Sequence, residues 1–176
     1  IQIDPGTAFG TGMHETTQLC IRQLRKYLFS GAELLDVGTG SGILSIVGLK
    51  LGAKHAVGTD LDPNAVSAAE ENRLANGISS EQFTVRIGNV IEDESLQQEI
   101  GLERYDIAVA NILADIIVLL QAEVARHIKR GGYLITSGIL ESKRQMVEDA
   151  LRQNTEFELV ETTVQGEWVS VTARRR

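Results

Sequence analysis

Residues 36–42 read Asp-Val-Gly-Thr-Gly-Ser-Gly, at the end of the apolar stretch 33–37 and directly before residues 42–51, which have the composition of a helix. Glycines at such a junction let the backbone turn tightly and let a ligand approach closely, and the free N–H groups of the following helix point at that ligand. Gly38 and Gly40 are therefore candidate ligand-binding residues. A merely structural turn is the alternative, although three glycines within five residues exceed what a turn needs.

The spacing of these glycines indicates the kind of ligand. A dinucleotide fingerprint has glycines at its first, third and sixth positions. Counted from Gly38, the sixth position is Ile43. The pattern is instead Gly-x-Gly-x-Gly preceded by an acid, which suits a cofactor that has no pyrophosphate to neutralise. Binding of a nicotinamide dinucleotide is therefore disfavoured.

Short apolar stretches alternate with helix-forming stretches along most of the chain, as is typical of a parallel sheet covered on both faces. Towards the end, residues 157–163 and 168–172 alternate apolar and polar side chains around Gln165-Gly166, which predicts a hairpin at a sheet edge. We therefore predict the α/β class, with a doubly wound, mostly parallel sheet and an antiparallel C-terminal hairpin. The expected strands are 33–37, 56–60, 83–87, 105–110 and 133–137, and the expected helices begin near residue 16 and span 42–51, 63–76 and 114–128.

The length fits one domain, which we place over residues 1–176. With 43% hydrophobic and 23% charged residues, the composition is that of an ordinary globular chain. The chain begins at Ile1, without an initiator methionine, and opens directly into a glycine-rich loop. We therefore expect that an upstream domain of the same protein is absent.

The composition also bears on location and partners. The longest apolar run, residues 116–120, is far shorter than the roughly 20 residues of a membrane-spanning helix, so we expect no membrane partner. No secretory signal is visible at the N-terminus. A lone cysteine, Cys20, cannot form an internal disulfide and fits a reducing, cytoplasmic setting. The net charge of −7 disfavours direct binding of nucleic acid.

Asp60 is the second candidate ligand-binding residue. It ends the second expected strand, and an ionised carboxylate there accepts hydrogen bonds from both hydroxyls of a ribose. Asp62 is better interpreted as the N-cap of the helix that begins at Pro63. The alternative for Asp60 is that it, too, only caps this helix.

Two asparagines follow later strands. Asn89 comes just after the third expected strand, where a side-chain amide can bind an adenine edge, although a turn asparagine explains it equally well. Asn111 ends the fourth strand, at the edge where ligands of open α/β sheets bind. It is either the N-cap of the next helix or a group that accepts a hydrogen bond from a target amine.

Together, residues 36–42, Asp60 and Asn111 resemble the class I S-adenosylmethionine-dependent methyltransferases. A closer resemblance lies in residues 4–17, which read Asp-Pro-Gly-Thr-Ala-Phe-Gly-Thr-Gly-Met-His-Glu-Thr-Thr, and in residues 40–44, 60–63, 111–114 and 137–140. These are similar to the family of methyltransferases that modify large-subunit ribosomal protein L11. The resemblance covers nearly the whole chain, and its opening segment is the most specific part.

The resemblance implies S-adenosylmethionine as the cofactor and no metal, because the sulfonium already activates the methyl group. It implies cofactor contacts for Thr17, Gly38, Asp60 and Asn111, and places Phe9 in a loop that closes over the cofactor. Asn111 is also the expected catalytic residue. The family carries an N-terminal domain that grips the substrate protein, and this chain lacks it.

The expected function is therefore methyl transfer to amines, either lysine side chains or the N-terminal amine, of a large-subunit ribosomal protein. The residues after Asn111 are Ile-Leu-Ala, without an aromatic ring to stack on a planar substrate, which favours an aliphatic amine over a nucleobase. Two alternatives stay open. One is a methyltransferase for another protein, a small molecule or RNA; the other is a cofactor-binding module that is inactive without a partner domain.

The remaining histidines and the cysteine have simpler interpretations. His14 and Glu15 are general-base candidates, but opening the first helix is the favoured explanation for both. His55 and His127 have no neighbours at metal-ligand spacing and are expected at the surface. Cys20 falls on the apolar face of its helix and is expected in the core.

Overall fold

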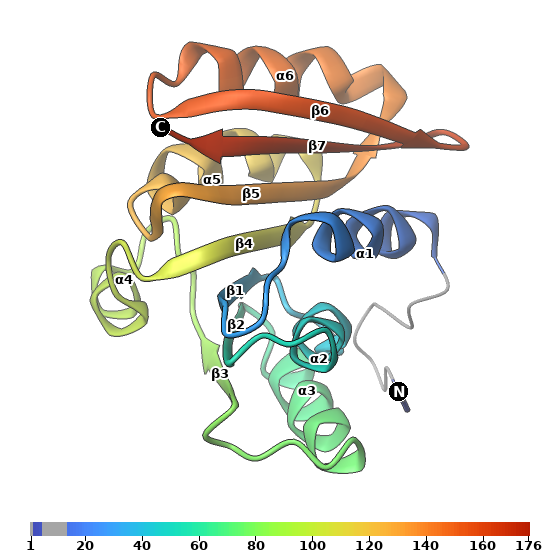
Figure 1. Ribbon diagram of the computed structural model, residues 1–176, viewed down its shortest axis with the longest axis vertical. Coiled ribbons are helices and arrows are strands. Elements are labelled where there is room, and N and C mark those ends of the chain that lie inside the picture. The colour runs from blue at the N-terminus through green and yellow to red at the C-terminus, as the bar shows by residue number, and fades with distance from the viewer. Residues whose placement is uncertain (1, 5–13) are drawn as a thin grey trace.

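The computed structural model describes residues 2–4 and 14–176, and its centre is one mixed sheet (Figure 1). Over these residues the sheet has seven strands in the order β3-β2-β1-β4-β5-β7-β6. The predicted class is confirmed. The strands β1 to β5 pair in parallel, whereas β7 pairs antiparallel with both of its neighbours, β5 and β6. The strands are β1 (Glu33–Val37), β2 (His55–Asp60), β3 (Phe83–Ile87), β4 (Tyr105–Asn111), β5 (Ile128–Leu140), β6 (Phe157–Gln165) and β7 (Trp168–Arg175).

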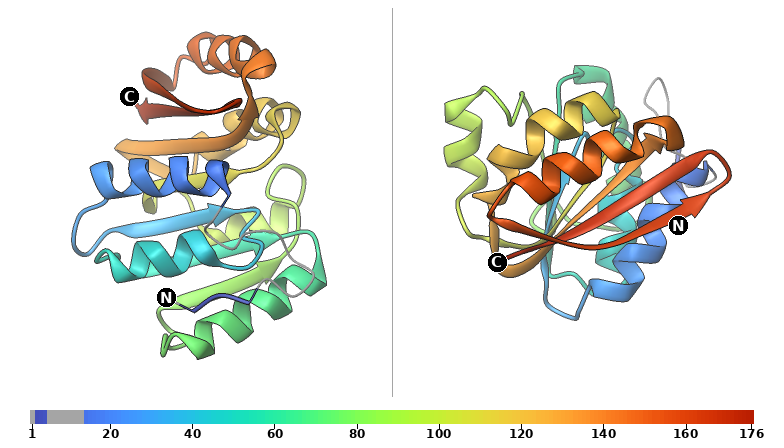
Figure 2. Two further views of the ribbon diagram at one scale, coloured as in Figure 1. Left: turned by 90° about the vertical axis from the view of Figure 1, so that its right-hand side faces the viewer. Right: turned by 90° about the horizontal axis from the view of Figure 1, so that it is seen from above.

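Helices cover both faces of this sheet, as Figure 2 shows from two sides. One face packs against α1 (Glu15–Tyr27), α2 (Ile43–Lys50) and α3 (Pro63–Ala75). The other packs against α4 (Glu94–Ile100), α5 (Ala114–Ala125) and α6 (Arg144–Gln153), the last of which follows a short 3-10 turn, Glu141–Lys143. The strand order reverses between β1 and β4, so the carboxyl ends of the central strands open at a topological switch point.

The central strands are mostly apolar because both of their faces are buried. In β1, Leu34 belongs to the core under α1 and α2, whereas Leu35 belongs to the core under α5. Both side chains are fully buried. Successive side chains of a strand point to opposite faces, so a strand between two helical layers favours apolar residues at successive positions.

The predicted C-terminal hairpin is present at one edge of the sheet. β7 pairs antiparallel with β5, and β6 pairs antiparallel with β7 at the outer side. The turn between them uses Gly166, whose φ of +61° suits glycine.

Two features differ from the sequence expectations. The helix expected to reach Ile128 ends at Ala125, because the carbonyls of Arg126 and His127 accept hydrogen bonds from the backbone just before and at the start of β4. Ile128 then pairs with Tyr105 as the first residue of β5. The helices α4 and α6 were not among the expected elements.

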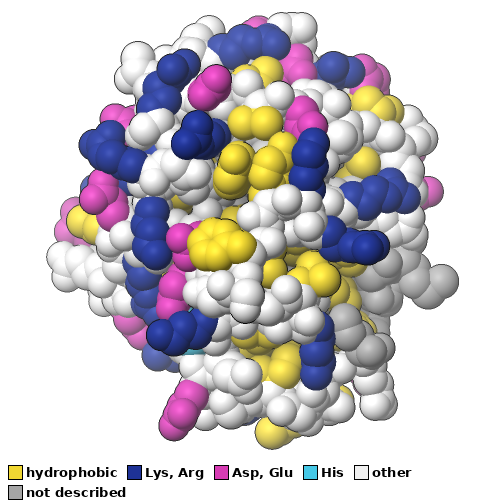
Figure 3. Space-filling model, viewed as in Figure 1, with side chains coloured by type: hydrophobic (Ala, Val, Ile, Leu, Met, Phe, Trp, Pro, Cys, Tyr) yellow, Lys and Arg dark blue, Asp and Glu magenta, His cyan; other side chains and the backbone are white. Residues whose placement is uncertain are grey.

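On the face shown in Figure 3, Lys and Arg side chains are interspersed with Asp and Glu side chains. Ion pairs among the described residues include Lys26 with Glu161 at 2.8 Å and Arg144 with the buried Glu148 at 3.2 Å. Within the described residues, no helix is long and apolar enough to cross a membrane.

Candidate functional site

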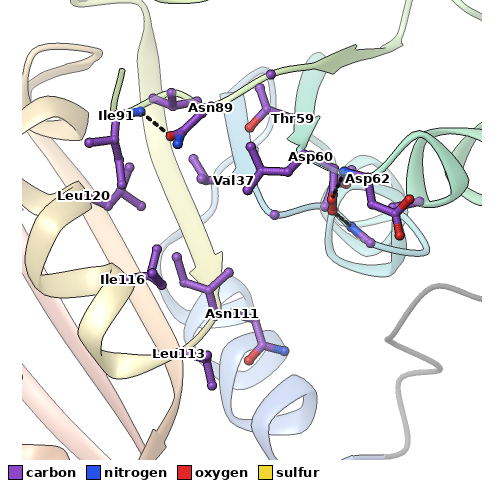
Figure 4. Close-up of a pocket in the computed structure, with 18 of the residues that line it drawn as sticks. Val37, Thr59, Asp60, Asp62, Asn89, Ile91, Asn111, Leu113, Ile116 and Leu120 are labelled. Carbon is purple, nitrogen blue, oxygen red and sulfur yellow. Dashed lines mark hydrogen bonds between the residues drawn. The ribbon is translucent and has the colours of Figure 1, made fainter. Parts of the chain in front are cut away.

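A pocket of about 560 Å³ opens at the carboxyl ends of β1, β2 and β4 (Figure 4). Val37, Thr59 and Asn111, at or next to the ends of these strands, line it. This is the edge at which ligands bind to open α/β sheets, and the volume falls within the range of small-molecule sites. The sequence prediction of a site at this edge is consistent with the pocket.

The glycine loop, residues 38–42, forms one wall of the pocket. Gly38 has a φ of +70°, and a Cβ atom there would lie 2.7 Å from Ile112 Cγ2. Gly42 has a φ of +85°, and a Cβ there would lie 3.1 Å from the ring of Phe83. Glycine is therefore required at both positions by backbone conformation and by space.

The side chain of Asp36, in β1, fixes the glycine loop through a hydrogen bond with Thr39. Its side chain is buried, and its Oδ2 accepts hydrogen bonds from the hydroxyls of Thr39 and Ser45, each at 2.8 Å. Burial raises the pKa of the Asp36 carboxyl to about 6, against the lowering effect of these two hydrogen bonds. The sequence analysis noted only that an acid precedes the glycines. The signal for a structural role was that this acid stands inside an apolar strand.

Asp60 lines the pocket beside the glycine loop. Its Oδ2 accepts a hydrogen bond from the N–H of Gly40 and its Oδ1 accepts one from the N–H of Asp62, both at 3.0 Å. Each carboxylate oxygen has two lone pairs, so each keeps an acceptor position for a ligand hydroxyl. Asp60 does not cap α3, because Asp62 does so: its side chain accepts from Asn64 N at 2.9 Å, with Pro63 next in the chain.

Asn89 lines the pocket just beyond the end of β3, the strand that pairs with β2 at Asp60. Its Oδ1 accepts a hydrogen bond from Ile91 N at 2.9 Å, which is the turn role considered from the sequence. The side-chain amide nitrogen is left for a ligand, because no described residue accepts a hydrogen bond from it. Both roles therefore fit the same residue.

Asn111 also lines the pocket, and its Nδ2 donates a hydrogen bond to Thr17 Oγ1 at 3.3 Å. The N-cap alternative for Asn111 is wrong, because Leu113 is the N-cap of α5. Thr17, buried in the first turn of α1, lines the pocket as well. Ser137 Oγ fixes the same turn by donating to the carbonyl of Thr16 at 2.7 Å. The ends of β4 and β5 thus position the start of α1 at the pocket.

The rim of the pocket carries exposed apolar side chains that the sequence analysis did not assign to it. Leu113 is 72% exposed and Leu119 is 61% exposed, and both line the pocket, as the half-buried Asn111 does. Figure 4 shows Ile116 and Leu120 of α5 facing the same space. Residues 113, 117, 120, 124 and 128 recur at helical spacing, but Leu113 is exposed and precedes α5 as its N-cap.

The candidate bases do not line the pocket. His14 is the N-cap of α1, with Nδ1 accepting from Thr16 N at 3.2 Å, and its ring lies edge-on to Trp168 at 5.3 Å. Glu15 is the exposed first residue of that helix. The favoured explanation, that both residues open α1, agrees with this arrangement. Phe9, the remaining expected cofactor contact, lies outside the described residues.

The surface placement of His127 is wrong. Its side chain is fully buried, with ring nitrogens 2.6 Å from the carbonyl oxygen of Gly101 and 2.7 Å from Glu123 Oε2. His55 is partly buried, and burial lowers its pKa. Cys20 is in the core as predicted, and burial raises the pKa of its thiol. The part of the chain that is described has no cluster of three His, Cys, Asp or Glu side chains that could hold a metal ion.

Known proteins are similar to this chain in sequence and in fold. A family model described as "Ribosomal protein L11 methyltransferase (PrmA)" matches residues 1–176. The ribosomal protein L11 methyltransferase of Lachnospira eligens is 54% identical over 176 residues, which are all of this chain and 55% of that protein. The chain spans about half the length of the curated relatives it matches.

Solved structures of methyltransferases are similar to this chain in fold. The crystal structure of the ribosomal protein L11 methylase from Lactobacillus delbrueckii subsp. bulgaricus superposes with a TM-score of 0.87 and 35% identity, covering 100% of this chain and 85% of that one. An RNA methyltransferase from Salinibacter ruber, solved with S-adenosyl-L-homocysteine, has a TM-score of 0.67 at 16% identity over 88% of each chain, which shows the shared fold. Because the family model matches every residue and the first relative exceeds half identity over the whole chain, the protein belongs to the ribosomal protein L11 methyltransferase family.

Proposed function

We propose that this chain is an S-adenosylmethionine-dependent N-methyltransferase domain whose substrates are amines of large-subunit ribosomal protein L11. The amines are lysine side chains or the N-terminal amine, and the protein acts in the cytoplasm, where ribosomes are made. The single observation that carries the proposal is the pocket in which Asp60 and Asn111 both face the space beside the glycine loop. Family membership supplies the class of reaction and substrate.

The pocket fits a nucleoside-containing cofactor. Asp60 offers two free acceptor positions for ribose hydroxyls, and Gly38 and Gly40 leave room for close approach to the loop. Asn89 and the apolar side chain of Ile91 suit a base on the far side. When bound, S-adenosylmethionine supplies a methyl group already activated by a sulfonium, so no metal is required.

Asn111 is the group proposed to act on the substrate. Its Nδ2 is occupied by Thr17, so its Oδ1 is the atom that can accept a hydrogen bond from an amine N–H and aim the nitrogen lone pair. Holding the reacting atoms in line can supply about 7–11 kcal/mol of the barrier. Asn111 is thus proposed as a catalytic residue that also lines the cofactor site.

The amine must be neutral to react. Deprotonating a lysine of pKa about 10.4 costs about 4.6 kcal/mol at pH 7. The exposed apolar side chains of Leu113 and Leu119 would desolvate an amine that approaches Asn111, and desolvation disfavours the ammonium form. The rim therefore lowers the cost of removing the proton without a dedicated base.

Two measurements test the proposal. Calorimetric titration of this chain with S-adenosylhomocysteine should give micromolar binding, whereas NADH in the same cell should give none. Transfer of labelled methyl groups from S-adenosylmethionine to purified protein L11 should then be detected. Binding without transfer would support the alternative of a module that needs a partner domain. Binding of NADH instead would contradict the proposal.

A further inference from the structure

Asn72 of helix α3 and Asn76, the C-cap of that helix, bind the backbone of residues 2–4 as a neighbouring strand would. Asn76 Oδ1 accepts from the N–H of Gln2 at 2.8 Å, and its Nδ2 donates to the carbonyl of Gln2 at 2.6 Å. Asn72 repeats this pattern on Asp4, with Oδ1 accepting at 2.8 Å and Nδ2 donating at 2.7 Å. Each side-chain amide thus satisfies both backbone groups of one residue.

The spacing explains why the two amides match an extended chain. Residues four apart on a helix are about 6 Å apart along its axis, and residues two apart on a strand are separated by about 6.6 Å. Between them, the side chain of Ile3 packs against the core beneath α2 and α3. The backbone of residues 2–4 is therefore held by four hydrogen bonds to the two asparagine side chains, and the Ile3 side chain adds an apolar contact.

Asn72 makes one further contact, which reaches the pocket. Its Nδ2 also donates to the carbonyl of Ser41 at 2.8 Å, and the Asn72 side chain is only 1% exposed. Ser41 belongs to the glycine loop, whose preceding residue, Gly40, is held by Asp60. Two successive residues of the loop are thus fixed from opposite sides, one by the end of β2 and the other by α3.

We propose that Asn72 is a positioning residue for the cofactor site, which fixes the glycine loop through the Ser41 carbonyl and ties it to the backbone of Asp4. The inference rests on the proposed function, because it assigns the loop to the cofactor. Asn72 uses one acceptor and both amide protons in these contacts. An aspartate has the same shape but no proton to donate when ionised, and it would place negative charge against two carbonyl oxygens.

The decisive experiment is calorimetric titration with S-adenosylhomocysteine of the wild type, Asn72→Asp and Asn64→Asp. Asn64 lies on the same helix with an exposed side chain, so its variant makes the same charge change away from the contact. Loss of the two hydrogen bonds that the amide donates, together with the new negative charge against these carbonyls, should raise the Kd of Asn72→Asp roughly tenfold or more, with Asn64→Asp near the wild type. The ratio of the Asn72→Asp and wild-type Kd values should shrink from pH 8 to pH 5.5, because the protonated carboxyl regains one donor.

The outcomes separate the two proposals. No binding to the wild type would overturn the proposed function. Binding to the wild type with an equal Kd for a folded Asn72→Asp would overturn the role of Asn72 alone. Should that variant fail to fold by circular dichroism, the side-chain amide protons of Asn72 in the labelled wild type decide. They should be protected from exchange and shift when S-adenosylhomocysteine is added, unlike those of Asn64, and the absence of both effects would overturn the inference.

Discussion

The carboxylate of Asp60 accepts a hydrogen bond of 3.0 Å from the backbone N–H of Gly40, so the end of β2 holds the glycine loop in place. The same carboxylate faces the pocket, where it is proposed to bind ribose hydroxyls. One side chain therefore serves both the shape of the loop and the recognition of the ligand.

Asp60→Ala should raise the Kd for S-adenosylhomocysteine about a hundredfold. Two hydrogen bonds to a charged acceptor are worth about 3 kcal/mol together, and the loop loses its anchor at Gly40 as well. Calorimetric titration measures the change. Asp149→Ala, which removes an exposed charge on α6, is the control and should leave the Kd unchanged. An Asp60→Ala Kd equal to that of the wild type would exclude Asp60 as the ribose acceptor.

Asn111→Ala should lower kcat about a hundredfold while changing the Kd for S-adenosylhomocysteine less than threefold. The reason is that its Oδ1 is proposed to orient the amine, and misplacing a reacting group can cost this much. Methyl transfer to protein L11 and calorimetry give the two numbers. The matched control is Asn154→Ala, since Asn154 bonds Gln121 and Glu156 instead of facing the pocket. Equal losses of kcat and affinity would make Asn111 a cofactor-binding residue only.

The buried carboxyl of Asp36 predicts an unusual dependence of stability on pH. Its pKa is about 6 in the folded chain and 3.8 in the unfolded chain, so the folded state binds more protons between these values. The contribution of Asp36 to the free energy of unfolding therefore falls as pH rises from about 4 to about 6, by about 3 kcal/mol in all.

Urea unfolding of the wild type and Asp36→Asn between pH 4 and pH 7 checks this prediction. The variant lacks the titrating group, so its stability relative to the wild type should increase by up to about 3 kcal/mol across the range. Asp149→Asn removes an exposed carboxyl and should show no such trend. A constant difference between Asp36→Asn and the wild type would mean that Asp36 does not titrate in this range.

Gly138→Ala should destabilise the protein by about 2–5 kcal/mol. Gly138 has a φ of +82°, and a Cβ there would lie 2.7 Å from the carbonyl oxygen of Ile112 and 3.0 Å from Asn111 Oδ1. Left-handed strain costs about 1–2 kcal/mol, and overpacking costs about 1–3 kcal/mol. Gly166→Ala, with φ +61° but no atom within 4 Å of the new Cβ, should show only the strain. Thermal and urea unfolding compare the two, and equal losses would rule out the clash.

The residues that were predictable from sequence are those whose roles are set by neighbours in the chain. The capping of α3 by Asp62 depends on Pro63 and Asn64, and the position of Asp60 follows from the strand that it ends. Periodicity alone also suggests α6, because Val147 and Leu151 share its buried face at helical spacing. That signal was present in the sequence and was not used.

The remaining roles depend on distant parts of the chain. His127 is buried because the segment before β4 folds over it, with Gly101 supplying a carbonyl. The contact of Asn72 with Asp4 and Ser41 joins three segments whose proximity no local pattern reveals. The exposure of Leu113 is not evident from the sequence either, because periodicity cannot distinguish the last residue before a helix from the first turn within it.

The hydrogen bond from Ser137 to the carbonyl of Thr16 joins residues 121 positions apart. Synthesis runs from the N-terminus, so α1 leaves the ribosome well before the strand that anchors its first turn. The glycine loop and Asp60 also precede that strand. A nascent chain that ends after β4 therefore has both of these proposed cofactor-binding parts, but it lacks the contact from Ser137 that fixes the first turn of α1, where Thr17 lies. We expect the ability to bind cofactor to arise late in synthesis, in one step, when β5 is added to the sheet.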